Sequence, residues 1–253
     1  MAGKMKLEPK YEEALQKFVK RYYGNKNIIG IILTGSFVHS RPDKNSDLDI
    51  HLVLKESKTR ERGNTWINGV EVEYFMNPIK QIENYFKEDF QKGKRVTAHM
   101  FVNSRVLYER GKELREVIAK ARKSLKLPLK KMSSGDIELA RYFIDDLEKD
   151  LEDSYIKKDE FSFNEIANEL LDKCLNLFFK INGKENEKPK RLFNYLFHID
   201  KKFANIYRKA LLEKKRSARY AAIIKTVRYT EELLGGKRSR EWKFITKCDY
   251  MGK

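Results

Sequence analysis

Residues 33–50 read LTGSFVHSRPDKNSDLDI, and this stretch determines both the fold and the chemistry expected of the chain. The apolar run IIGIILT at 28–34 predicts a buried strand, which the turn residues Gly35 and Ser36 end. A second predicted strand, DLDIHLVL at 47–54, starts with alternating polar and apolar residues. Because side chains alternate along a strand, Asp47 and Asp49 are expected on one face.

The chemistry of these residues points to a nucleotide and a metal. Two adjacent carboxylates repel each other unless a cation lies between them, and oxygen ligands suit Mg²⁺, which completes its shell with waters and phosphates. Backbone N–H groups at Gly35, together with the Ser36 hydroxyl, are expected to receive a phosphate. A third carboxylate, Glu71 or Glu73 from the predicted strand GVEVEYFM at 69–76, would complete a site for two metal ions.

The string TGSFVHSRPDKNSDLDIHLVL resembles the signature of the DNA polymerase β-like nucleotidyltransferase superfamily. That signature is a hydrophobic residue, Gly, then Gly or Ser, a spacer, and Asp-x-Asp or Asp-x-Glu between hydrophobic residues. The segment GVEVEYFMNP is similar to the third-carboxylate strand of small bacterial members, including aminoglycoside nucleotidyltransferases of the kanamycin type. The resemblance implies a two-metal, Mg²⁺-dependent transfer of a nucleoside monophosphate from an NTP to a hydroxyl.

The resemblance also implies roles for individual residues. It assigns Gly35 and Ser36 to phosphate binding and the pair Asp47 and Asp49 to the two ions. Glu73 is favoured as the third ligand, because its place just before the Tyr-Phe-x-Asn-Pro turn fits the family better, while Glu71 stays open as the alternative.

Three further residues are candidates for contact with the nucleotide. Ser46, just before the carboxylate pair, either turns the loop or touches phosphate, and Lys44 either reaches the triphosphate or is an ordinary loop residue. In the later half, an Asn-Gly turn at 182–183 followed by Pro189 and Lys190 resembles a family arrangement that brings a lysine to phosphate. The alternative for Lys190 is an ordinary solvated position at a helix N-terminus.

Hydrophobic periodicity predicts an α+β protein with two domains. A helix at 8–22, strands at 28–34, 47–54, 69–76 and 105–109, and a helix from Pro78 to about 91 indicate a small mixed sheet within a nucleotidyltransferase domain at 1–110. Helical spacing then continues at 112–125, 135–157, 161–180, 190–212 and 217–234, which predicts a helical bundle at 111–253.

Composition narrows the class of protein. The net charge is +17, and the segment 180–253 contributes +13 of it, from 21 Lys and Arg against 8 Asp and Glu. A nucleic-acid partner is therefore conceivable, but it is not favoured because no repeated aromatic-basic pattern supports one. No apolar run reaches a membrane-spanning length, and two cysteines, Cys174 and Cys248, suit a reducing cytoplasm.

The sequence therefore predicts a cytoplasmic, ATP-binding enzyme that moves AMP from ATP, or an NMP from another NTP, onto a hydroxyl acceptor. Pyrophosphate leaves in the reaction, and two Mg²⁺ ions serve as cofactors. A small molecule such as an aminoglycoside is the expected acceptor. Adenylylation of a protein or an RNA end, and a module that binds nucleotide without catalysis, remain the alternatives. Homodimerisation is also left open.

Overall fold

The computed structural model describes residues 7–38, 42–43 and 45–245, and the chain divides into two compact units, Met1–Pro128 and Leu129–Lys253. The division lies later than the expected boundary at 110. The helix α4 (Glu113–Lys126) follows that boundary, yet it packs on the sheet through the buried residues Leu114, Val117 and Ala121. It therefore belongs to the first unit.

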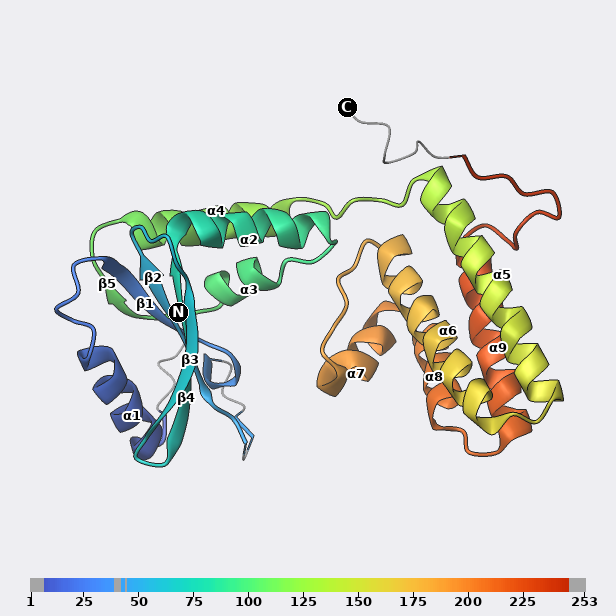
Figure 1. Ribbon diagram of the computed structural model, residues 1–253, viewed down its shortest axis with the longest axis horizontal. Coiled ribbons are helices and arrows are strands. Elements are labelled where there is room, and N and C mark those ends of the chain that lie inside the picture. Colours follow the sequence, from blue (N-terminus) through green and yellow to red (C-terminus); the bar gives the residue numbers. More distant parts are fainter. Residues whose placement is uncertain (1–6, 39–41, 44, 246–253) are drawn as a thin grey trace. The chain divides into compact units, whose positions relative to one another are not determined.

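The first unit is a mixed five-stranded sheet with helices on both faces (Figure 1). The strands run in the order β3-β4-β2-β1-β5, with β2 and β4 parallel and the other neighbours antiparallel. In chain order the elements are α1 (Pro9–Lys20), β1 (Ile28–Thr34), the 3₁₀ turn η1 (Ser36–Val38), β2 (Leu48–Leu54), β3 (Glu61–Ile67), β4 (Val70–Pro78), α2 (Ile79–Gln91), α3 (Val96–Val102), β5 (Arg105–Glu109) and α4.

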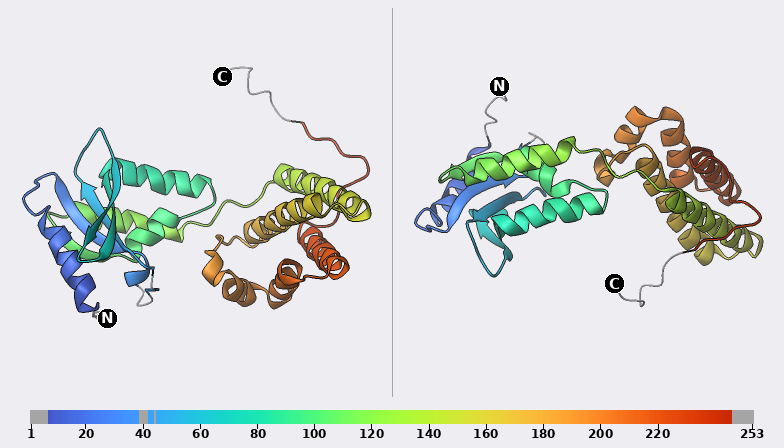
Figure 2. Two further views of the ribbon diagram at one scale, coloured as in Figure 1. Left: turned by 60° about the horizontal axis from the view of Figure 1, so that its bottom comes forward. Right: turned by 90° about the horizontal axis from the view of Figure 1, so that it is seen from above.

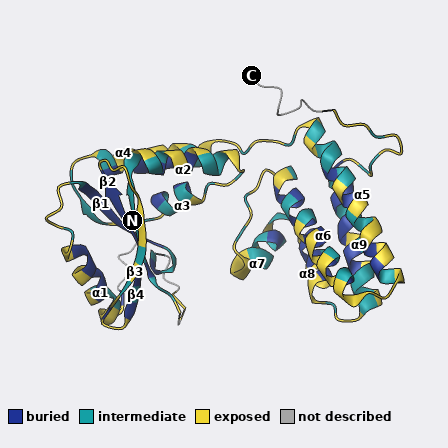
Figure 3. Ribbon diagram, viewed as in Figure 1, coloured by how far each residue is buried: buried dark blue, intermediate teal, exposed yellow. Residues whose placement is uncertain are grey.

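Two hydrophobic clusters fix the sheet between its helices. Leu15 and Phe18 of α1 pack with β-strand residues such as Ile50 on one face. Ile82 of α2 and Phe101 of α3 join α4 on the other face. The central strands β1 and β2 are consequently almost wholly buried, whereas the edge strand β3 is largely exposed (Figure 3).

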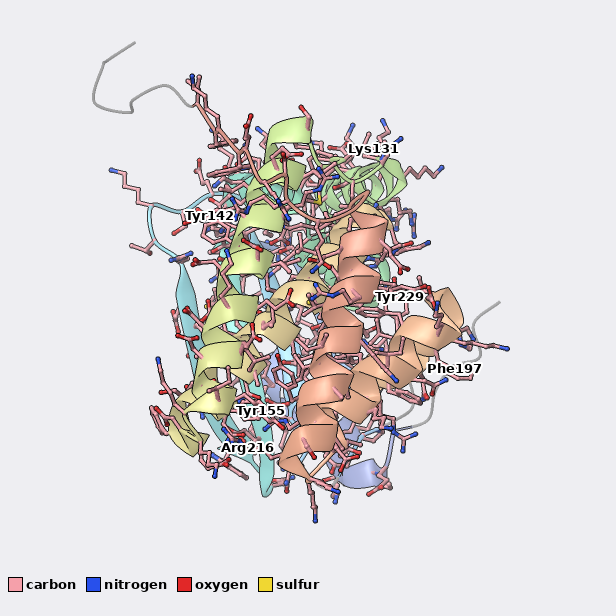
Figure 4. All side chains as sticks on the ribbon, turned by 90° about the vertical axis from the view of Figure 1, so that its right-hand side faces the viewer. Lys131, Tyr142, Tyr155, Phe197, Arg216 and Tyr229 are labelled. Atoms are coloured by element: carbon pink, nitrogen blue, oxygen red, sulfur yellow. The ribbon has the colours of Figure 1, made fainter. Side chains whose placement is uncertain are left out.

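The second unit is a bundle of helices (Figure 2). Its elements are α5 (Ser134–Ile156), α6 (Glu160–Ile181), α7 (Pro189–Ile199), α8 (Lys201–Leu212) and α9 (Arg216–Leu233). The rings of Phe178 and Phe203 stack at 4.0 Å in its core. Arg216 joins the start of α9 to the end of α5, because it donates to the carbonyls of Ser154 and Tyr155 and lies over the Tyr155 ring (Figure 4).

The expected single helix at 190–212 is wrong, because Asp200 separates α7 from α8. Asp200 has an extended backbone, and its carboxylate accepts a hydrogen bond of 2.9 Å from the backbone N–H of Phe203. An aspartate in this conformation caps the N-terminus of a new helix and cannot continue the previous one.

The expected α+β class is confirmed, because a unit built on a mixed sheet precedes a helical unit. Among the helices of the described ranges, none has both the length and the apolar character that crossing a bilayer requires.

Candidate active site

The turn after β1 places its backbone close to the carboxylate of Asp49. Gly35 has a φ of +76°, a left-handed conformation that favours glycine. A Cβ atom at this position would lie 2.0 Å from Oδ2 of Asp49, so a larger residue would collide with the carboxylate. Ser36 follows at the start of η1, and the buried ring of Phe37 anchors this turn in the core.

Asp49 lies in the middle of the sheet with a neighbour on each side. Its Cα partners are Thr34 on β1 and Glu73 on β4. Leu48 and Ile50 on either side of it are fully buried, so they fix the strand and turn the Asp49 side chain to the opposite face. Asp47 precedes the first residue of β2 and therefore reaches the same face from the end of the loop.

These elements bring three carboxylates together. One oxygen from each of Asp47, Asp49 and Glu73 lies within 4.8 Å of the other two, and all three residues are half-buried. Glu71 points to the same face, but its Oε1 accepts a 2.9 Å hydrogen bond from Asn64 and it lies outside this cluster. Of the two alternatives for the third carboxylate, Glu73 is the one beside the aspartate pair.

Strand β3, which the sequence patterns did not predict, adds a cation to the cluster. Arg62 donates from Nε and Nη2 to the same oxygen of Glu73, at 2.9 and 2.6 Å. It lines a cleft of about 300 Å³ together with Asp47, Gly63, Asn64, Glu71 and Glu73. The signal for β3 was present in the dipeptide Asn68-Gly69, which forms the two-residue hairpin turn into β4 with φ of +53° and +76°.

Two rings, those of His51 on β2 and Phe75 on β4, lie on the same face of the sheet as the carboxylates, two residues further along each strand than Asp49 and Glu73. His51, two residues after Asp49, stacks on Phe75 with ring centroids 4.8 Å apart. Burial lowers the pKa of His51 to about 4, so the imidazole is neutral at pH 7. Its Nε2 is buried, and no hydrogen-bond partner for it lies within the described part of the chain.

The remaining expected residues lie in different places. The Ser46 hydroxyl accepts a 2.7 Å hydrogen bond from the backbone N–H of Asp43, so this residue shapes the loop before Asp47. Lys44 and Cys248 lie outside the described residues. Lys190 is exposed in the first turn of α7 in the second unit, directly after Pro189, and its contact with phosphate stays a prediction.

The donor set fits a divalent cation of the Mg²⁺ type. It offers only carboxylate oxygens, which are hard ligands, and half-burial leaves room for the waters and phosphates that complete an Mg²⁺ shell. Asp49 and Glu73 are direct partners on the hydrogen-bonded neighbouring strands β2 and β4, which keeps the distance between these two ligands nearly fixed.

Comparisons with known proteins bear on the family and the fold of this chain. A sequence profile of the nucleotidyltransferase domain matches residues 12–156, more than half of the chain. A nucleotidyltransferase-like protein from Exiguobacterium sibiricum 255-15 has a similar structure, with a TM-score of 0.50, 13% identity, and coverage of 89% of this chain and 74% of that one. An aminoglycoside 6-adenyltransferase from Bacillus subtilis aligns with a TM-score of 0.33 and 10% identity, over 92% of this chain and 94% of that one.

No curated protein sequence matches the chain. At 13% identity the Exiguobacterium sibiricum structure shows a shared fold, while the domain profile shows the family. The match begins in α1, contains the Gly35 turn and all three carboxylates, and ends with α5. The chain therefore belongs to the nucleotidyltransferase domain family.

Proposed function

We propose that the protein transfers a nucleoside monophosphate, AMP from ATP, to a hydroxyl group of an acceptor. The acceptor oxygen forms a bond to the α-phosphorus while the bond from that phosphorus to the bridging oxygen of pyrophosphate breaks. The hydroxyl proton leaves to solvent or to a base. The observation that carries this proposal is the cluster of Asp47, Asp49 and Glu73 beside the turn at Gly35.

In this proposal the chain supplies binding and orientation. The backbone at Gly35 and the Ser36 hydroxyl would hold the triphosphate, because this turn lies against Asp49 and carries no side chain at its closest point. Asp47, Asp49 and Glu73 would hold two Mg²⁺ ions. When bound, such ions lower the pKa of the attacking hydroxyl and offset the charge of the leaving pyrophosphate.

The proposed acceptor is a small molecule with a free hydroxyl, such as an aminoglycoside. The support is the likeness of the stretch through Glu73 to small bacterial nucleotidyltransferases, together with the carboxylate of Glu71, which lines the cleft outside the metal cluster and would attract a cationic acceptor. Cytoplasmic location and homodimerisation stay predictions.

The experiment is a transfer assay with α-labelled ATP, Mg²⁺ and the purified protein. A panel of aminoglycosides, total tRNA and a cell lysate would be supplied separately. We expect label on a small molecule, and none with Asp49→Asn. Label on RNA or on a protein would replace the proposed acceptor, and transfer that survives Asp49→Asn would refute the proposed site.

A matched pair of variants tests the choice of third carboxylate. Glu73→Gln should remove most of the transfer activity, because this carboxylate lies opposite Asp49. Glu71→Gln removes the same charge from the same cleft, but its partner is Asn64, so activity should fall only slightly. Equal losses in the two variants would contradict the assignment.

A further inference from the structure

Arg62 on β3 is the feature of this cleft that the proposed reaction does not yet use. Its side chain is 70% exposed, and both of its bonds to Glu73 go to the single oxygen Oε1. The guanidinium also lies over the ring of Phe75, 5.0 Å from the centroid. An exposed guanidinium held by one oxygen and one ring can change partners without disturbing the sheet.

The register of the sheet explains how Arg62 reaches the carboxylates. Arg62, Phe75 and His51 are direct partners across β3, β4 and β2 and form one row on the sheet face. Asn64, Glu73 and Asp49 form the next row. Arg62 therefore reaches diagonally from its own row to Glu73. A metal ion that binds Glu73 would have to compete with this guanidinium for the same carboxylate.

We propose that Arg62 occupies Glu73 while the metal site is empty and moves to the phosphate oxygens of the nucleotide when the metal–nucleotide complex binds. Guanidinium groups pair with phosphates through two parallel hydrogen bonds, so the triphosphate offers Arg62 a better partner than one carboxylate oxygen. This inference rests on the proposed function, since it requires Glu73 to be a metal ligand.

The proposal requires opposite effects on the two ligands. Without Arg62, a metal ion alone meets no competitor at Glu73 and should bind more tightly. The nucleotide loses a cationic partner and should bind more weakly. If Arg62 merely held Glu73 in place for the metal, its removal would weaken the binding of both.

The test measures binding rather than turnover, so it needs no acceptor. Binding of Mn²⁺ alone would be measured by the loss of the electron paramagnetic resonance signal of the free ion. Binding of a non-hydrolysable ATP analogue with Mg²⁺ would be measured by calorimetry. For Arg62→Gln we expect the Mn²⁺ Kd to fall about fivefold, as for removal of one unit charge near a divalent ion in a water-exposed cleft. The Kd of the analogue should rise about tenfold.

Arg60→Gln is the matched control. Arg60 lies two residues before Arg62 on the same edge of the sheet, and its Nη1 donates to the Tyr85 hydroxyl at 2.6 Å. Both dissociation constants should stay within about twofold of the original protein, because this arginine is outside the cleft. Arg62→Lys keeps the charge without the planar fork, so Mn²⁺ binding should be unchanged and the analogue should bind with intermediate affinity.

Either of two results would overturn the proposal. One is Mn²⁺ binding in Arg62→Gln that is unchanged or weaker, and the other is unchanged affinity for the analogue. If the original protein binds Mn²⁺, these results remove only the role of Arg62. If neither the original protein nor Arg62→Gln binds Mn²⁺, both this proposal and the proposed metal site fail.

Discussion

The close approach of Gly35 to Asp49 gives a sharp prediction for Gly35→Ala. With a φ of +76°, any residue other than glycine is expected to cost about 1–2 kcal/mol of stability. The added Cβ would lie 2.0 Å from Oδ2 of Asp49, whereas a Cβ atom normally stays at least 3.0 Å from other heavy atoms. The carboxylate must therefore move by about 1 Å. A shift of that size at a group that positions reactants lowers the rate about hundredfold.

Gly69→Ala separates backbone strain from the collision with Asp49. Gly69 also has a φ of +76°, but a Cβ there would have no described atom within 4 Å. Urea unfolding should show similar losses of stability in the two variants. Transfer of labelled AMP and Mn²⁺ binding should fall only in Gly35→Ala. Near-normal transfer in Gly35→Ala, or an equal loss in Gly69→Ala, would refute this reasoning.

Three further changes test other parts of the molecule. Asp47→Asn should lower transfer at least about hundredfold, with a thermal midpoint that is unchanged or higher because a like charge is removed; a large drop in midpoint would contradict this. Arg228→Met leaves the buried Glu231, 2.7 Å away, without its charge partner, and denaturant unfolding should show a loss of stability of about 3 kcal/mol. Burial raises the pKa of Cys174 to about 12, so its thiol is protonated and unreactive at pH 8. In a Cys248→Ser background, a disulfide reagent at pH 8 should therefore label Cys174 only after unfolding. Rapid labelling of the folded protein would contradict this expectation.

Much of the sheet could be predicted because its strands carry strong patterns. The structure places β1 and β5 at the bounds expected from the sequence, 28–34 and 105–109. Strand β3 does not show in the sequence patterns, because ERGNTWI is mostly polar and its edge position leaves most of its residues exposed, so it lacks a regular hydrophobic alternation. The break at Asp200 was missed because the apolar spacing continues on both sides of it.

The candidate site was predictable where its residues share a short stretch of chain. Gly35, Asp47 and Asp49 lie within one strand-turn-strand segment, so their proximity follows from local order. The distinction between Glu71 and Glu73 needed the register of β4 against β2, which sequence alone does not fix. The place of Arg62 beside Glu73 depends on the register of β3 against β4, which the sequence alone does not specify.

The pairing of β4 with β2 also determines where the chain can tolerate inserted or deleted residues. A slip of one residue would place Val72 or Tyr74 opposite Asp49 and turn Glu73 to the other face. The turn at Asn68 and Gly69 has only two residues and is too short to compensate for such a slip. Among relatives with this site, length should therefore vary in the connection from 55 to 60 before β3, while the spacing from the hairpin turn to Glu73 stays constant.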